Sequence, residues 1–520
     1  MLAGGARTMA QSVMVMGTSS HVGKSVLATA LCRIFYQDGF HVAPFKVQNM
    51  SRNSAVTPDG LEISRAQATQ AAAAGIAPNV HMNPILLKPT DGHSSQVIVQ
   101  GRVYAEQSAA SYMHSDKDAL WQAAQASFRY LTERFAVIVM EGAGSPVEMN
   151  LKARDLANMR AAEMAQAAVI LVADIERGGV FASVIGTLEL LEPAERARVV
   201  GLVINKFRGD PALFDDGVRF LEERTGIPVL GVIPYLPDLA IDEEDSLGLD
   251  APRYAPDQRA GIRIGIVPLP HIANFTDVDP LFWEADVGPF FARAPEDLAQ
   301  ADGIIVPGTK NTMEDLVWLH ATGWAEALQN ARSQQIPILA ICGGYQMLGM
   351  VVRDPDQLES HRVKVPGLGW APHETTLVSP KRTQWVQGHL TDPWSAIPVK
   401  GYEIHMGRTV PIGDSKPFAT VHPTGDALGR PDGIVIGQMA VVGTYLHGVL
   451  DNQGFRELWL NQVRRRAGRD LQPSTLSVDD LREKAYDRLA TAVRGHLQLD
   501  LLYDVVGLKK LGDEHNGSVS

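Results

Sequence analysis

The feature that most constrains this chain is a buried strand that runs into a cysteine and two glycines. Residues 336–341 read Ile-Pro-Ile-Leu-Ala-Ile, and Cys342-Gly343-Gly344 is followed by helix-forming residues. This order predicts a strand, a sharp turn and a helix, because glycines permit backbone angles that side chains forbid. A helix N-terminus stabilises a thiolate through its dipole and its free N–H groups. Cys342, at the turn, is therefore a candidate nucleophile.

The run Cys-Gly-Gly-Tyr-Gln-Met-Leu-Gly at 342–349 resembles the nucleophile turn of glutamine amidotransferases, which hydrolyse glutamine and release ammonia. The resemblance implies a catalytic histidine roughly a hundred residues downstream, and His447 in Thr-Tyr-Leu-His-Gly supplies it. Val449 stands where many of these enzymes have a glutamate that orients the imidazole. The sequence thus leaves open which group fixes the tautomer of His447.

A second glycine loop follows the predicted strand at 304–306. Gly308 in this loop and Gly343 after the cysteine are the candidate backbone N–H donors of an oxyanion hole.

Composition excludes several classes of protein. The chain has 520 residues, of which 45% are hydrophobic and 20% charged, which is ordinary for a soluble globular protein of more than one domain. A net charge of −12 argues against non-specific nucleic-acid binding. No apolar run reaches the ~18 residues of a membrane span, so we expect no membrane association. The two cysteines form no disulfide framework and suit a reducing cytoplasm, and Cys32 is expected to pack in a helix.

The N-terminal region carries a phosphate-binding pattern. A short strand at 12–16 leads into Gly17-Thr18-Ser-Ser-His-Val-Gly23-Lys24-Ser25, and a helix is predicted at about 26–37. The backbone of such a loop cradles phosphates, with the lysine on the β and γ phosphates and the hydroxyl on Mg²⁺. The loop therefore predicts ATP and magnesium binding.

The length of this loop resembles that of the dethiobiotin synthetase-like ATPases. That resemblance implies that Glu141, in Glu-Gly-Ala-Gly after the strand 135–140, holds Mg²⁺ with Ser25. It also implies that Asn205, in Asn-Lys-Phe-Arg-Gly, belongs to the base-recognition loop. Asp59 is a candidate third magnesium ligand.

The pattern of elements predicts two α/β domains. Strands and helices alternate from 12 to 236, as expected for a parallel sheet covered on both faces. We expect tails at 1–11 and 509–520, a linker at 237–260 rich in Pro, Asp and Glu, and a class I-like glutamine amidotransferase domain at 261–508 with C-terminal helices. An apolar stripe in the helix after Ser477 predicts a packing surface.

Further loops resemble those of the cobyric acid synthase family over residues 12 to 500. The match includes Lys-Val-Gln-Asn-Met-Ser-Arg-Asn-Ser at 46–54 and Gly-Tyr-Glu-Ile-His-Met-Gly at 401–407. The resemblance implies amidation of the b, d, e and g carboxylates of adenosylcobyrinic acid a,c-diamide through acyl phosphates, with glutamine as the ammonia source. Corrinoid contacts are expected at Gln48, Asn49, Asn53 and Lys88.

Other enzymes and one ATPase class remain as alternatives. The a,c-diamide synthase has Gly-Pro-Asp-Tyr-Ile-Asp where this chain has 48–53, and CTP synthase should show His-x-Glu where Val449 stands. A ParA/MinD-type switch carries a lysine at the position of Thr18 and lacks a fused glutaminase. The sequence does not indicate the oligomeric state.

Overall fold

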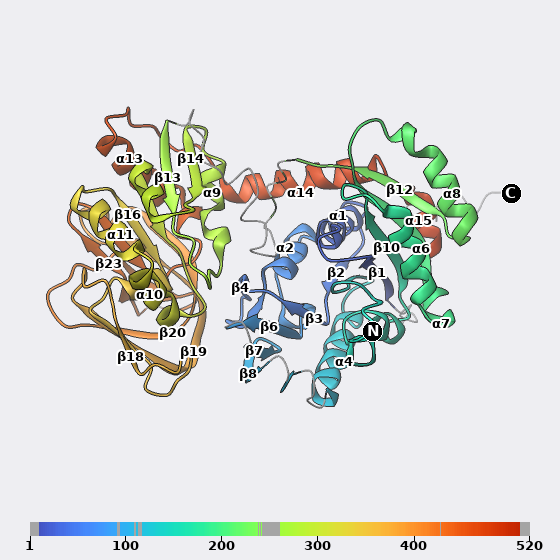
Figure 1. Ribbon diagram of the computed structural model, residues 1–520, viewed down its shortest axis with the longest axis horizontal. Coiled ribbons are helices and arrows are strands. Elements are labelled where there is room, and N and C mark those ends of the chain that lie inside the picture. Colours follow the sequence, from blue (N-terminus) through green and yellow to red (C-terminus); the bar gives the residue numbers. More distant parts are fainter. Residues whose placement is uncertain are drawn as a thin grey trace, which may run out of the picture.

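The computed structural model describes residues 10–90, 94–108, 111–112, 117–237, 239, 241, 261–426 and 428–509. The chain forms two α/β units, on the right and left of Figure 1. This confirms the predicted fold class. Most of the predicted linker and most of each predicted tail lie outside the described residues, but Gln11 of the first tail already belongs to the first strand.

The first unit is built on a six-stranded parallel sheet in the order β12-β11-β10-β1-β9-β2. Val13 and Val15 of the first strand face one core, whereas Met14 and Met16 face the other. Burial of both faces explains why these strands are continuous apolar runs. The strands are β1 (Gln11–Gly17), β2 (Val42–Phe45), β9 (Val137–Glu141), β10 (Ala168–Asp174), β11 (Val199–Phe207) and β12 (Val229–Pro234).

Helices cover both faces of this sheet. The face of Met14 packs against α4 (Asp118–Thr132), α5 (Met159–Met164), α6 (Val180–Leu190) and α8 (Asp215–Thr225). The face of Val13 packs against α1 (Lys24–Gln37), α14 (Val478–Arg494) and α15 (Leu499–Val506).

The last two helices pack on the first unit, although the expected boundaries grouped them with the second. Figure 1 shows α14 passing from one unit to the other. Leu489 is fully buried beside residues of α1, and Arg33 of α1 forms ion pairs with Asp487 at 2.8 Å and Glu483 at 2.9 Å. The backbone N–H of Gln498 donates to the Leu230 carbonyl at 2.7 Å. The apolar stripe predicted a packing surface, and the surface that it contacts is the sheet and α1 of the first unit.

An extra layer lies between the main sheet of the first unit and the second unit (Figure 1). It comprises a four-stranded sheet, a two-stranded hairpin and the helix α2 (Arg65–Ala73), and its strands were not predicted. The strands are β3 (Gln48–Met50), β4 (Ser54–Val56), β5 (Glu62–Ser64), β6 (Ile85–Pro89), β7 (Ser94–Val99) and β8 (Arg102–Ser108).

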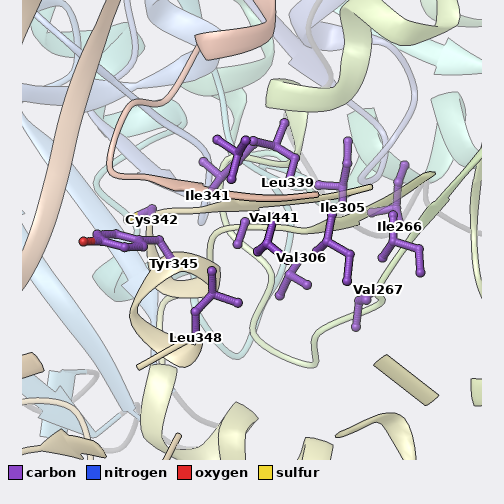
Figure 2. Close-up of a cluster of buried hydrophobic side chains, with 14 of the residues drawn as sticks. Ile266, Val267, Ile305, Val306, Leu339, Ile341, Cys342, Tyr345, Leu348 and Val441 are labelled. Atoms are coloured by element: carbon purple, nitrogen blue, oxygen red, sulfur yellow. The ribbon is translucent and has the colours of Figure 1, made fainter. Parts of the chain in front are cut away.

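The second unit has a six-stranded sheet in the order β14-β13-β15-β16-β24-β23, parallel except for its last strand. Figure 2 shows its core, where Ile305, Leu339 and Val441 pack together and Cys342 lies at the end of the cluster. The strands are β13 (Ile262–Ile266), β14 (Val287–Phe291), β15 (Gly303–Val306), β16 (Ile338–Ile341), β23 (Ile434–Ile436) and β24 (Val441–Thr444).

The remaining elements surround this sheet. The helices are α9 (Asp279–Phe282), α10 (Thr312–Ala321), α11 (Trp324–Ser333), α12 (Gly343–Met347) and α13 (Gln453–Arg466). A further sheet contains β17 (Val351–Arg353), β18 (Lys364–Pro366), β19 (His373–Leu390), β20 (Pro398–Pro411), β21 (Ala419–Pro423) and β22 (Arg430–Asp432). Among the described residues, no helix has the length and apolar character that crossing a membrane requires.

Leu489→Ala tests the packing of α14 on the first unit. The truncation leaves a cavity in a closed core, which typically costs about 2–5 kcal/mol. We expect calorimetry to show a lower unfolding temperature for the transition that Mg-ATP raises, because a ligand stabilises the unit that binds it. The exposed Lys484→Ala on the same helix is the control and should leave this transition in place. If Leu489→Ala lowered only the transition insensitive to Mg-ATP, this packing would be contradicted.

Candidate active sites

Cys342 lies at a strained turn between β16 and α12. Its backbone has φ 52° and ψ −107°, a conformation that residues other than glycine rarely adopt. Such strained conformations are concentrated at functional sites. Gly344 permits the turn to approach the neighbouring strand, since a Cβ there would lie 2.3 Å from the Val306 carbonyl oxygen. The predicted strand, turn and helix are present. Cys342 is 5% exposed, and its thiol donates to the Ile404 carbonyl at 3.7 Å.

His447 follows β24, which pairs in parallel with β16, so the two strands bring His447 and Cys342 to the same edge of the sheet. Nδ1 of His447 lies 2.6 Å from Oδ2 of Asp277, and the N–H of Gly448 donates to the other carboxylate oxygen at 2.9 Å. Because the carboxylate accepts from Nδ1, Nε2 is the nitrogen left to exchange a proton with the thiol. Asp277 is therefore the group that fixes the imidazole.

The charges around His447 favour the imidazolium. Burial alone would lower the pKa of His447, but interactions with Asp277 and with Cys342, each also hydrogen bonded to the ring, raise it to about 10. An imidazolium beside a thiolate is the activated form of a cysteine–histidine nucleophile.

Asp277 was not predicted from the sequence. It lies in the short 3₁₀ helix Phe275–Val278, 11 residues after β13 ends at Ile266. The available signal was its place in the loop at the carboxyl end of a parallel strand, where the nucleophile and the histidine also follow their strands.

The two glycines predicted for the oxyanion hole lie beside the thiol. A Cβ on Gly308 would be 3.0 Å from Cε1 of His447 and 3.7 Å from Cβ of Cys342. A Cβ on Gly343 would be 3.1 Å from the backbone nitrogen of Thr309. Gly343 is also the first residue of α12, where an N–H has no acceptor within the helix.

A cavity of about 30 Å³ adjoins the thiol. Its lining comes mostly from the second unit, but Lys88 enters it from β6 of the first. The lining residues are Lys88, Ala273, Asn274, Thr309, Lys310, Thr312, Cys342, Gly343, Gln346, Glu359, Lys381, Ile404, His405, Met406 and His447. The cavity thus lies where the two units meet.

The glycine loop joins β1 to α1 as predicted. Gly17 ends the strand, Thr18 donates its N–H to the Val172 carbonyl at 2.9 Å, and Gly23 precedes the helix with φ 99°. The Lys24 ammonium donates to the carbonyls of Ser19 and Gly144, each at 2.9 Å. It therefore spans the phosphate loop and the loop that follows Glu141.

Ser25 and Glu141 meet although they follow different strands. The Ser25 hydroxyl donates to Oε1 of Glu141 at 2.8 Å, and Lys46 pairs with the same oxygen at 2.9 Å. Gln70 donates to the other carboxylate oxygen at 2.6 Å. A hydroxyl oxygen and a carboxylate oxygen are ligands that Mg²⁺ prefers, so Ser25 and Glu141 fit this metal. Lys46 and Gln70 were not predicted as members of this cluster.

Asp59, the candidate third magnesium ligand, has Thr57 as a hydrogen-bond partner. It is exposed in the turn between β4 and β5 and accepts a hydrogen bond from Thr57 at 2.5 Å. Within the described ranges, no group of three or more His, Cys, Asp or Glu side chains could hold a metal ion.

Asn205 contacts the phosphate loop. Its side-chain amide donates to the Val22 carbonyl at 2.8 Å, and a Cβ on Gly23 would be 2.1 Å from the amide nitrogen. In this arrangement Asn205 orders the loop on which the phosphates would lie.

The residues predicted to contact the corrinoid divide into two pairs. Gln48 accepts from the Tyr112 hydroxyl at 2.6 Å, and Asn49 donates to Ser64 at 2.9 Å, so both make contacts within the first unit. Asn53 and Lys88 lie at the junction of the units: Asn53 Oδ1 accepts from the Phe275 N–H at 3.3 Å, and Lys88 lines the thiol cavity.

Comparison with known proteins gives the same division of the chain. The CobB/CobQ-like glutamine amidotransferase domain matches residues 263–455, and the CobQ/CobB/MinD/ParA nucleotide binding domain matches residues 13–248. These ranges contain the thiol site and the phosphate loop, respectively.

Curated relatives match over nearly the whole chain. Cobyric acid synthase of Klebsiella pneumoniae subsp. pneumoniae is 47% identical over 505 residues, which cover 96% of this chain and 98% of the relative. The enzyme of Moorella thermoacetica is 46% identical over 508 residues (96% and 98%), and that of Pelotomaculum thermopropionicum is 48% identical over 519 residues (96% and 97%). On this identity and coverage, the chain belongs to the cobyric acid synthase family.

Proposed function

We propose that this protein amidates the b, d, e and g carboxylates of adenosylcobyrinic acid a,c-diamide, using ATP and ammonia from glutamine. The observation that carries the proposal is the thiol cavity, because Cys342 and His447 share it with Lys88 of the nucleotide-binding unit. Ammonia released there is formed at the junction with the unit that would consume it. The relatives are named for the synthesis of cobyric acid, which supports a corrinoid as the acceptor.

The glutaminase step follows from the geometry of the cysteine and the histidine. The Cys342 thiolate attacks the carboxamide carbon of glutamine, and the N–H groups of Gly308 and Gly343 receive the developing oxyanion. The C–N bond breaks, and His447 gives its proton to the leaving nitrogen. Water then hydrolyses the thioester to glutamate, with His447 as the base.

The ATP step belongs to the first unit. A corrinoid carboxylate attacks the γ-phosphate, which gives an acyl phosphate and ADP, and ammonia then displaces inorganic phosphate to form the amide. Lys24 and the backbone from Gly17 to Gly23 would hold the phosphates. Ser25 and Glu141 would hold Mg²⁺, which offsets phosphate charge when bound. Lys46 carries an ammonium beside the same carboxylate and would also favour the transferred phosphate.

The corrinoid site and the cellular compartment are also part of the proposal. Gln48, Asn49, Asn53 and Lys88 would place the corrinoid between the Ser25–Glu141 contact and the thiol cavity, with Asp59 on the rim of the same layer. A thiol nucleophile works best where thiols stay reduced, so we expect the enzyme to act in the cytoplasm.

Cys342→Ser tests the source of nitrogen. A serine hydroxyl is a much weaker nucleophile than a cysteine thiolate. We therefore expect glutamine hydrolysis to be lost while amidation with added ammonium persists. Burial, followed by the charge of Glu141, raises the pKa of Cys32 well above its usual range, so Cys32→Ala should leave both activities in place. Glutamate release and corrinoid mass are the measurements. Normal glutamine turnover in Cys342→Ser would contradict the assignment.

Asp277→Asn tests the orientation and charge of His447. The amide removes the carboxylate charge that raises the pKa of His447, so the imidazolium is lost at lower pH and the alkaline limb of glutaminase activity should move to lower pH. We expect kcat/KM for glutamine to fall ~10²–10⁴-fold. The control is Asp302→Asn, which removes the charge of a carboxylate that accepts from the Arg263 N–H next to the amino end of β15. An unshifted pH profile in Asp277→Asn would refute this role.

Lys24→Ala and Glu141→Gln test the phosphate site. Loss of the Lys24 charge should slow amidation roughly 10²–10³-fold with either nitrogen source. Glu141→Gln should raise the Mg²⁺ concentration needed for half-maximal rate, because an anionic ligand is lost.

Both variants are assayed with ammonium, ATP and the corrinoid across a Mg²⁺ series. Lys152→Ala removes a lysine paired with Glu195 and serves as the control for Lys24. Asp59→Asn should leave the Mg²⁺ requirement unchanged, because Asp59 is exposed and bonded to Thr57. An unchanged ammonia-dependent rate in Lys24→Ala would contradict the ATP step.

A further inference from the structure

A second histidine, His405, lines the thiol cavity. It lies on β20, directly after Ile404, whose carbonyl accepts the hydrogen bond of the Cys342 thiol. Only 7% of His405 is exposed. The glutaminase step as derived above uses His447 and leaves His405 without a role.

The surroundings of the His405 ring fix its tautomer. Nδ1 lies 2.8 Å from the Gly407 carbonyl oxygen, and because a carbonyl only accepts, Nδ1 must carry the proton. The ring stacks on Tyr445, with centroids 3.8 Å apart and planes 16° from parallel. Ring orientation and tautomer are therefore both held by neighbours.

The other ring nitrogen has no partner. Nε2 of His405 is buried, and among the described residues it has no hydrogen-bond partner. Buried polar atoms without partners are uncommon in folded proteins and call for a specific cause, such as a ligand. Burial lowers the pKa of His405 to about 4, with Glu403 opposing and Arg382 adding to the effect, so the ring is neutral at neutral pH. A neutral ring protonated on Nδ1 leaves Nε2 as an acceptor only.

The carboxamide of glutamine offers the donor that this acceptor lacks. Its oxygen belongs in the oxyanion hole, which leaves the two N–H bonds of the amide nitrogen to be satisfied. His447 cannot accept from them while it is an imidazolium. Glutamate, the product, presents a carboxylate with no donor, and an ester of glutamate presents an alkoxy oxygen with no donor.

We propose that Nε2 of His405 accepts a hydrogen bond from the amide nitrogen of glutamine in the thiol cavity, so that His405 selects an amide over an ester or a carboxylate. The proposal rests on the glutaminase function proposed above. It predicts that His405 contributes to the reaction of glutamine and not to that of an ester with the same carbon skeleton.

The test compares kcat/KM for L-glutamine and L-glutamate γ-methyl ester in the full-length enzyme. His405→Phe keeps an aromatic ring against Tyr445 and removes the acceptor. We expect kcat/KM for glutamine to fall roughly 10–100-fold, because the amide donor is left unpaired in the binding site, while kcat/KM for the ester stays the same. His405→Gln places an acceptor oxygen near the position of Nε2 and should recover part of the preference for glutamine.

His373→Phe is the matched control. His373 is buried and stacks edge-to-face on Tyr345, and burial lowers its pKa to about 4, but it is not part of the cavity lining. The ratio of kcat/KM for glutamine to kcat/KM for the ester should stay at the wild-type value in this variant. Equal losses for both substrates in His405→Phe, or no loss for either, would overturn the role of His405. A wild-type enzyme that hydrolyses neither substrate would overturn the glutaminase proposal itself.

Discussion

The hydrogen bond between His447 and Asp277 is the contact on which the rest of the thiol site depends. It gives the imidazole one tautomer and one orientation. The negative charge of the Asp277 carboxylate also raises the pKa of His447, against the effect of burial, which would favour the neutral ring. The strained backbone of Cys342 aims the thiol at the same point. Cys342 and His447 act as a pair, because a cysteine nucleophile needs a base held in the correct orientation beside it.

The loop that carries Asp277 also joins the two units. Asn274 accepts from the Ser54 N–H at 2.8 Å, and its amide nitrogen lies 3.4 Å from Nε2 of His447. Close by, Glu62 of the first unit forms ion pairs with Lys88 at 2.8 Å and with Lys381 of the second unit at 2.6 Å. Burial alone would raise the pKa of Glu62, but the two lysines hold it well below its usual range. Removing one member of such a buried network leaves an uncompensated charge, which is strongly unfavourable. The network of Glu62, Lys88 and Lys381 therefore favours this one arrangement of the two units.

Sequence reasoning reached the parts of the sites that follow strands directly. Cys342 was predictable from its strand, turn and helix. The family resemblances implied His447 and the pairing of Ser25 with Glu141, and these residues follow parallel strands whose carboxyl ends meet at one edge. Asp277 was not predictable, because it lies in a single-turn 3₁₀ helix 170 positions from His447 in the sequence and no periodicity marks it. The apolar stripe on α14 predicted that the helix packs but not on which unit, because an apolar face can pack equally well against any other apolar surface.

The most direct test of the account is the origin of the nitrogen in the product. The full-length enzyme would be given ATP, the a,c-diamide corrinoid, glutamine labelled with ¹⁵N in its side-chain amide, and an excess of unlabelled ammonium. Because the thiol cavity lies at the junction of the units, we predict that mass spectrometry finds ¹⁵N in the b, d, e and g amides with little dilution. Amides that carry the isotope ratio of the mixed ammonia pool would show that ammonia leaves the enzyme before it reacts, and would contradict a shared site at the junction.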